Sequence, residues 1–284
     1  MFEMIFENKN GKQLRFGPGT PFTIKEFTGL NPPKATINTN ETALLDGATF
    51  NSSKLQMRSI NIAFVIERDA EASRLKCYEV IQNKLPIRIY YKSALLDVFI
   101  DGYVEDFDFS YFTKKIIATL SVLCPSPFLK GAQEVVNELT AITNMFHFPF
   151  HSTAEPMLVM GKIDTLTSIE VENKGNVETG LTFEIYARKP LKNPKIYNYK
   201  TGEFLEVNIE MDTGDLIIIT TGQGNKTIKL LRSAVYTNIF NYLGKNSTWL
   251  QLDVNGSVFV YEVGEGNPAD LIITIKHYDL FEGV

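Results

Sequence analysis

Four carboxylates crowd a short stretch of the chain and are its closest approach to a catalytic set. Asp101, Glu105, Asp106 and Asp108 lie within eight residues. Paired carboxylates act as acid and nucleophile in glycoside hydrolysis. These four, however, fall on both parities of a strand pattern, so we expect their side chains to point to opposite faces of a sheet. The pattern favours a solvated acidic edge over a hydrolase site.

The other patterns with chemical meaning are incomplete. His147 and His151 are four residues apart, a spacing that binds zinc on a helix, but Pro149 lies between them and no third ligand is near in sequence. Gly222-Gln223-Gly224 lacks the third glycine of a dinucleotide-binding loop, and a strand pattern follows it, which indicates a turn. No serine lies in a G-x-S-x-G elbow. We therefore expect no enzyme activity, no cofactor and no metal site.

Trp249 is the single tryptophan, and Tyr236, Phe240 and Tyr242 precede it closely. Aromatic rings of this kind can stack on the apolar faces of sugars, which makes Trp249 a candidate glycan contact. The alternative is that a tryptophan at the start of a strand anchors the core. The sequence leaves both readings open and favours the core anchor.

Composition indicates a folded protein rich in strands. The 284 residues are 44% hydrophobic, with 20 Phe and 12 Tyr. A formal net charge of -5 argues against specific nucleic-acid binding, although a weakly acidic surface suits a conduit that must not hold DNA. We expect no membrane insertion and no secretion signal, because no apolar run approaches about 18 residues and the first residues lack a basic segment. Cys77 and Cys124 are expected to be reduced core residues, as in a protein made in a cytoplasm.

The first part of the chain predicts a sheet with one helix. Strict alternation of apolar and polar residues predicts long strands over 55–68, 95–109 and 116–123. Between the first two, Asp69 can cap a helix that ends near Asn83, with Ala72, Leu75, Tyr78 and Ile81 on its buried face. The sheet pattern stops at Cys124-Pro125-Ser126-Pro127-Phe128, because proline cannot donate to a strand ladder. We therefore expect a first domain over 1–131.

One polar excursion interrupts this domain. Residues 34–54 show little alternation, and a loop of about this length, here 31–54 in all, is usually functional or ordered by a partner. We predict that it is an arm between subunits; an ordinary mobile hairpin is the alternative. The residues expected at this interface are Pro32, Pro33, Thr36, Asn38, Leu44, Leu45, Asp46, Gly47 and Phe50.

The remainder predicts a connector and a second domain. Residues 132–155 are irregular and aromatic without period, and we expect a connector there. From Pro156 onward, short strand patterns recur about every 8–12 residues with well-marked turns, which is typical of a β-sandwich. The expected second domain covers 156–284, and the expected fold class is mostly β with one helix.

The order of several motifs is similar to that of siphophage distal tail proteins. In the first domain these are Gly29-Leu30-Asn31-Pro32-Pro33, the Asp46-Gly47 loop, the strand from Gln56 to Ile62, and the prolines around Ser126. In the second they are Asn193–Asn198, Thr201-Gly202-Glu203, Gly214–Thr221 and Gly224-Asn225-Lys226. The resemblance covers nearly the whole chain. One departure is Ser126, where many members carry an acid between the prolines.

This resemblance implies a structural virion protein of a phage or prophage. It implies a homohexameric ring that serves as a hub at the distal end of the tail, made in the host bacterial cytoplasm and joining the tail tube to the tail tip or baseplate. The first domain would be a ring-forming, tail-tube-like β-sandwich, and the second a galectin-like or carbohydrate-module-like β-sandwich. Implied partners are further copies of the chain, the tail tube protein, the tape measure protein, and a tail-associated lysin, fibre or receptor-binding protein. The alternative function is a carbohydrate-binding module protein that attaches to host cell-wall glycans.

Overall fold

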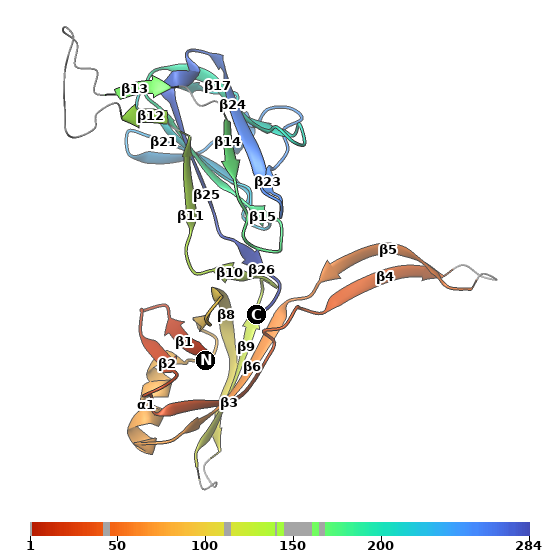
Figure 1. Ribbon diagram of the computed structural model, residues 1–284, viewed down its shortest axis with the longest axis vertical. Helices are drawn as coiled ribbons and strands as arrows, with labels where there is room; N and C mark the ends of the chain where they lie inside the picture. The colour runs from red at the N-terminus through yellow and green to blue at the C-terminus, as the bar shows by residue number, and fades with distance from the viewer. Residues whose placement is uncertain (1, 42–45, 111–114, 140, 145–160, 165–167) are drawn as a thin grey trace, which may run out of the picture. The chain divides into compact units, whose positions relative to one another are not determined.

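The computed structural model in Figure 1 describes residues 2–41, 46–110, 115–139, 141–144, 161–164 and 168–284. The chain divides into two compact units. The first comprises Met1–Gln133 with Leu280–Val284, and the second comprises Glu134–Asp279. Each unit has its own cluster of buried apolar side chains. The expected mostly β fold with one helix is confirmed.

The first unit is built on one large antiparallel sheet. Its main path runs in the order β2-β1-β7-β8-β9-β6-β3, and β10 and β26 join it beside β8. Phe16 on β2 and Phe22 on β3 lie at opposite ends of this path, yet their rings are 5.6 Å apart, and both contact Phe64 on β6. The sheet therefore curls over on itself and encloses its apolar side chains. The strands are β1 (Glu3–Asn8), β2 (Gln13–Phe16), β3 (Phe22–Thr28), β6 (Arg58–Ile66), β7 (Pro86–Lys92), β8 (Asp97–Ser110), β9 (Ile117–Cys124), β10 (Leu129–Gly131) and β26 (Leu280–Phe281).

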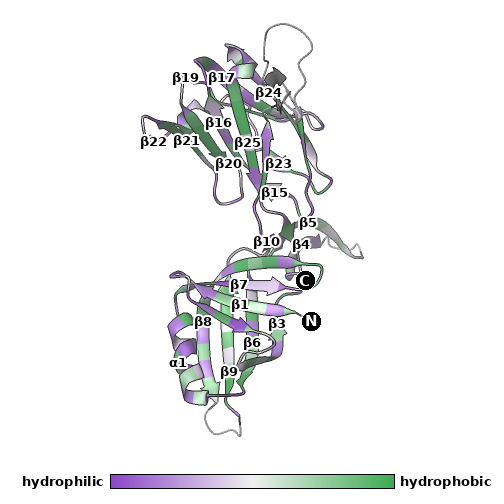
Figure 2. Ribbon diagram, turned by 60° about the vertical axis from the view of Figure 1, so that its left-hand side comes forward, coloured by the Kyte–Doolittle hydropathy of each residue, from purple (hydrophilic) through white to green (hydrophobic). Residues whose placement is uncertain are grey.

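The helix α1 (Ala70–Val80) begins where the sequence predicts, but it buries a different face. Ser73, Cys77 and Val80 are buried, whereas Leu75 is 53% exposed and Tyr78 is 40% exposed. Small side chains at the contact let the helix lie close to the sheet, and the ring of Tyr78 packs edge-on against Phe109 at 5.3 Å. The expected stripe through Ala72, Leu75 and Tyr78 is therefore wrong. Figure 2 shows the mixed hydropathy of this helix beside the alternation along the strands.

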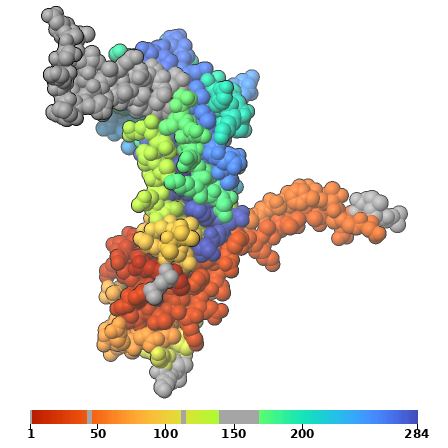
Figure 3. Space-filling model, viewed as in Figure 1, coloured from red at the N-terminus to blue at the C-terminus, as the bar shows by residue number. Residues whose placement is uncertain are grey.

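A long hairpin projects from the first unit. It consists of β4 (Ala35–Glu41) and β5 (Ala48–Leu55), which pair with each other and, among the described residues, with no other strand. Figures 1 and 3 show it reaching away from the curled sheet. We call residues 35–55 the arm.

The second unit is a sandwich of two antiparallel sheets. Phe183 of one sheet meets Phe259 of the other at 5.7 Å between ring centroids, inside a single core. The larger sheet contains β11 (Val135–Leu139), β25 (Leu271–His277), β16 (Thr182–Ala187), β20 (Leu216–Thr220), β21 (Thr227–Arg232) and β22 (Val235–Asn238). The smaller contains β14 (Ser168–Val171), β24 (Ser257–Glu265), β17 (Leu191–Asn198), β18 (Phe204–Glu206) and β19 (Glu210–Met211). Shorter elements are β12 (Ala141–Asn144), β13 (Gly161–Asp164), β15 (Thr179–Gly180), β23 (Gln251–Leu252), η1 (Phe240–Tyr242) and η2 (Pro268–Asp270).

This division differs from the expected limits of 1–131, 132–155 and 156–284 in two places. Within the expected connector, residues 135–139 form β11 and pair with β25, so they belong to the second unit. Residues 280–284 return to the first unit, where β26 pairs with β10. Both differences rest on pairings between segments far apart in sequence. Residues 145–155 of the connector lie outside the described part of the chain.

Candidate functional site

The structure separates the four carboxylates into two environments. Asp101 accepts a hydrogen bond of 2.6 Å from Nε of Arg88. A bulge in β8 between Val104 and Asp106 then shifts the register, and Glu105, Asp106 and Asp108 are all exposed. The expectation that the four point to opposite faces is therefore wrong: Asp101 shares the face of the exposed Tyr103, and the extra residue at the bulge brings Asp106 and Asp108 onto that same face.

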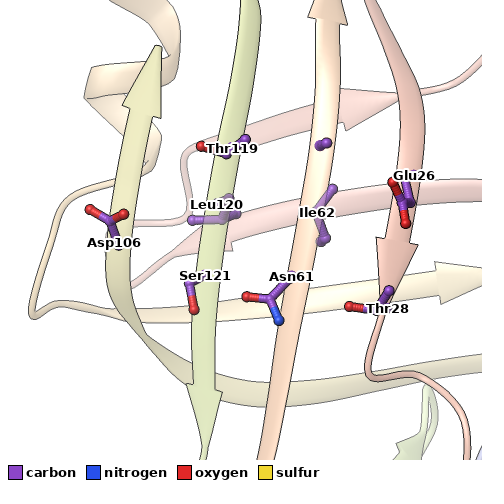
Figure 4. Close-up of a pocket in the computed structure, with 9 residues that line it drawn as sticks. Glu26, Thr28, Asn61, Ile62, Asp106, Thr119, Leu120 and Ser121 are labelled. Atoms are coloured by element: carbon purple, nitrogen blue, oxygen red, sulfur yellow. The ribbon is translucent and has the colours of Figure 1, made fainter. Parts of the chain in front are cut away.

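Glu105 and Asp106 lie beside a shallow groove on the outer face of the first sheet. Glu105 accepts a hydrogen bond of 2.9 Å from Oγ of Ser121, and Asp106 stands opposite Ser121 in the strand register. Figure 4 shows Asp106 and Glu26 on the outer strands of the groove, with polar side chains of β6 and β9 between them. Its lining residues are Glu26, Thr28, Asn61, Ile62, Ala63, Asp106, Thr119, Leu120 and Ser121. This face is polar and acidic, with short side chains.

The remaining chemical candidates have structural roles or lie outside the description. His147 and His151 fall outside the described residues. Gly222 and Gly224 lie in the turn between β20 and β21, as predicted, and Gly224 has a φ of 77°. Cys77 and Cys124 are buried free thiols whose pKa values burial raises to about 12. No group of three or more His, Cys, Asp or Glu side chains that could hold a metal ion occurs among the described residues.

The arm contains most of the residues that the sequence predicts at a subunit interface. Thr36 and Asn38 lie on β4, Phe50 lies on β5, and Asp46 and Gly47 precede β5. Pro32 and Pro33 lie just before the arm, whereas Leu44 and Leu45 fall outside the described residues. The structure thus places the described members of this set along the hairpin or just before it, and the interface role itself stays a prediction.

The two faces of the arm differ in polarity. Ile37 and Thr39 alternate onto the same face of β4, and Phe50 stands opposite Thr39 in the register. Ile37 is 64% exposed and Phe50 is 63% exposed. The other face carries Asn38, whose Nδ2 donates to Oγ of Ser52 at 3.0 Å. The arm therefore offers an apolar face and a polar face to its surroundings.

Sequence reasoning placed Ile37 within the expected arm but left it out of the expected interface residues, and it missed Arg58 at the base of the arm. A single apolar residue in a polar stretch carries no periodic signal of its own. The strand pairing, which places Ile37 and Phe50 on one face, is the signal that sequence alone lacks. Arg58 is 3% exposed, although arginine side chains are rarely buried to this extent unless their charge is paired or hydrogen-bonded.

Trp249 is partly buried against the second core. The ring of Phe240 lies 5.6 Å from the Trp249 ring, and Nζ of Lys226 lies 5.4 Å from the same ring. These contacts fit the reading of Trp249 as an anchor, because neighbours already occupy part of its surface. Tyr236 and Tyr242 nearby are 62% and 50% exposed. The glycan contact stays a prediction.

The fold and its exposed features define a mostly β protein of two units with a projecting arm. Residues 174–276 match the family model described as siphovirus-type tail component, C-terminal domain. The chain is also similar in structure to SPP1 Dit (gp 19.1), described as a hub adsorption apparatus in phages that infect Gram-positive hosts, with a TM-score of 0.67 and 16% identity, covering 99% of both chains. The family match and this shared fold support a siphophage distal tail protein, as the motif order indicated.

Two further structures share the fold. A chain of the phage P2 baseplate in its activated conformation with Ca has a TM-score of 0.51 and 10% identity, over 97% of this chain and 98% of that chain. The same baseplate with Sr gives a TM-score of 0.50 with the same identity and coverage. No curated protein sequence matches the chain. Within the described residues, no helix has the length and apolar character needed to cross a membrane.

Proposed function

We propose that this protein forms a homohexameric ring and acts as the hub at the distal end of a phage tail, without catalytic activity. The observation that carries the proposal is the arm, which pairs only with itself among the described residues and exposes Ile37 and Phe50 on one face. A lone two-stranded hairpin is at best marginally stable in water. An arm of this kind gains stability when its apolar face covers another subunit.

The family match and the shared fold support a tail location. Those structures come from a hub adsorption apparatus and a phage baseplate. In a closed ring built from one kind of interface, every arm contacts the same surface of the next copy, so the apolar face of every arm is covered. We propose the tail tube protein, the tape measure protein and a tail-associated lysin, fibre or receptor-binding protein as further partners in the virion.

The acidic groove of the first unit fits the wall of a channel through such a ring. Glu26, Glu105 and Asp106 give this face negative charge, and its Ser and Thr side chains are short and project little from the surface. Carboxylates repel the phosphates of DNA, so a wall of this kind binds passing DNA weakly. The net charge of -5 points in the same direction.

The arm is tested by changing its apolar face alone. The double variant Ile37→Ser with Phe50→Ser removes two exposed apolar side chains and no hydrogen bond or ion pair of the described structure. We expect it to be monomeric at micromolar concentration, where the natural chain has the mass of six copies. Light scattering over a range of concentrations measures both masses.

The matched control changes the polar face of the same arm. Asn40→Ser with Lys54→Ser replaces two exposed residues of the opposite face. We expect this control to assemble like the natural chain. Full assembly of the Ile37 and Phe50 variant would contradict the role of the arm, and a natural chain that stays monomeric at micromolar concentration would count against self-assembly.

A further inference from the structure

Arg58 joins the two chain segments at the base of the arm. It is the first residue of β6 and follows the arm closely in sequence. Its side chain reaches back to the segment that leads into the arm, where Nη1 donates to the carbonyl oxygens of Gly29 at 2.7 Å and Asn31 at 2.9 Å. We call residues 29–34 together with 56–58 the arm root.

The rest of the guanidinium binds two further segments. Nε and Nη2 donate to the carbonyl oxygen of Pro127 at 3.0 and 2.7 Å, and Nη2 also donates to the carbonyl oxygen of Glu282 at 2.6 Å. A guanidinium has five N–H donors, so these contacts use every one. All the acceptors are main-chain carbonyls. A buried charge held in this way is sensitive to the position of each segment, because any carbonyl that moves leaves a donor without a partner.

Residues 280–284 close the arm root from the other side, and we call them the strap. Leu280 and Phe281 pair with β10, and the ring of Phe281 packs against the first core. Gly283 lies against Pro32 so closely that an added Cβ would be 2.8 Å from Cδ of the proline ring. The amide of Val284 donates to the carbonyl oxygen of Leu30 at 3.2 Å. The strap therefore contacts Leu30 and Pro32, which alternate along the chain with the Gly29 and Asn31 that Arg58 holds.

We propose that the strap locks the arm root, with Arg58 as the positioning residue, and so sets the direction in which the arm projects. The proposal rests on the proposed function, in which the arm joins subunits. At roughly 3.3 Å per residue, Phe50, which stands opposite the fifth residue of β4, lies about 16 Å from the root, so a swing of about 15° moves it by about 4 Å and moves Ile37 by somewhat less. That displacement is as large as an apolar contact distance. A loose root would therefore carry Ile37 and Phe50 away from their partner surface.

The test uses Gly283→Ala, which adds one methyl group between the strap and the rigid ring of Pro32. The matched control is Gly17→Ala in the same unit, where the nearest atom to the new Cβ is 3.7 Å away. Hydrogen exchange is measured on dilute protein. In Gly283→Ala we expect amides of the arm root, such as Gln56 bonded to the carbonyl oxygen of Lys34, to exchange at least about tenfold faster. Amides of β6 and β9 should keep their natural rates, and so should every amide of the control.

Arg58→Lys provides a second, independent variant. Lysine keeps the positive charge but has three donors on one atom, so it cannot replace the five hydrogen bonds that the three guanidinium nitrogens make. The same selective acceleration at the arm root is expected. Unchanged exchange at the root in both variants would overturn the proposal, and so would an equal acceleration across the whole first unit in Gly283→Ala, because that result describes general destabilisation.

Assembly is measured separately on the same proteins. If the natural chain does not assemble, the proposed function fails while the exchange result still decides the strap. If the natural chain assembles and Gly283→Ala loosens the root, we expect the oligomer of the variant to dissociate at a concentration at least about tenfold higher. A loosened root with undiminished assembly would show that the strap does not serve the arm.

Discussion

At the residue scale, buried ionisable side chains are held in contrasting ways. Arg58 is satisfied by main-chain carbonyls, and Asp215 is paired with Arg232, whose Nε lies 3.0 Å from both carboxylate oxygens. His277 differs from both. Its side chain is fully buried, its ring nitrogens have no hydrogen-bond partner in the described structure, and Oδ1 of Asp279 is 3.5 Å from Nε2. Burial lowers the pKa of His277, and this effect outweighs the opposing influence of Asp279 and Glu134.

His277 should therefore make the second unit sensitive to mild acid. The unfolded chain binds a proton near the ordinary pKa of 6.5, whereas the folded chain resists it. The free energy of unfolding should be level above about pH 7 and should fall as the pH drops below about 6.5, by at most about 1.4 kcal/mol per pH unit. Urea unfolding between pH 5.5 and 7.5 measures this slope. His277→Gln should lessen it, and an unchanged slope in that variant would contradict the assignment.

At the element scale, close packing between β8 and β9 limits which residue β8 can carry at position 102. Gly102 lies in β8, where an added Cβ would be 2.5 Å from Cγ1 of Val122 and 2.8 Å from Sγ of Cys124. Both neighbours are fully buried in β9, so neither can move aside easily. The absence of a side chain at Gly102 is thus a packing requirement of the β8–β9 pair.

Gly102→Ala should destabilise the first unit by about 1–3 kcal/mol, since overpacking a dense core displaces its neighbours. Gly222→Ala is the matched control, because nothing lies within 4 Å of its added Cβ. Thermal unfolding of the two variants beside the natural chain measures the difference. Equal midpoints for Gly102→Ala and the natural protein would show that β8 and β9 have room to spare.

At the scale of the whole molecule, two separate cores predict two unfolding events. Ile60 belongs to the first core and Ile273 to the second, and both are fully buried. Units of this kind commonly unfold independently, because each could fold around its own core. The chain crosses from one unit to the other twice, once after Gln133 and once after Asp279.

Matched substitutions should assign the two events. Ile60→Val and Ile273→Val each remove one methylene, at a cost of about 1 kcal/mol. Scanning calorimetry should show two transitions, with each variant lowering a different one by about 3 °C. The two variants act as controls for each other. A shift of the same transition by both would mean that the units unfold as one.

The sequence by itself determined the fold class, the strand-rich halves and the position of the arm. Period-2 alternation in 55–68 and 116–123 reports burial on one face, and that signal is local. The polar character of 31–54 likewise marked a segment that does not belong to the sheet. The motif order also indicated the family resemblance that the later comparisons support.

The tertiary structure alone decided which faces and segments meet. The buried face of α1, the bulge that turns Asp106 outward, and the shared face of Ile37 and Phe50 all depend on register or packing between separate elements. The extreme case is the hydrogen bond from Arg58 to Glu282, which joins residues 224 positions apart. Local periodicity extends over a few residues, so no pattern around Arg58 could indicate that the strap returns to hold it.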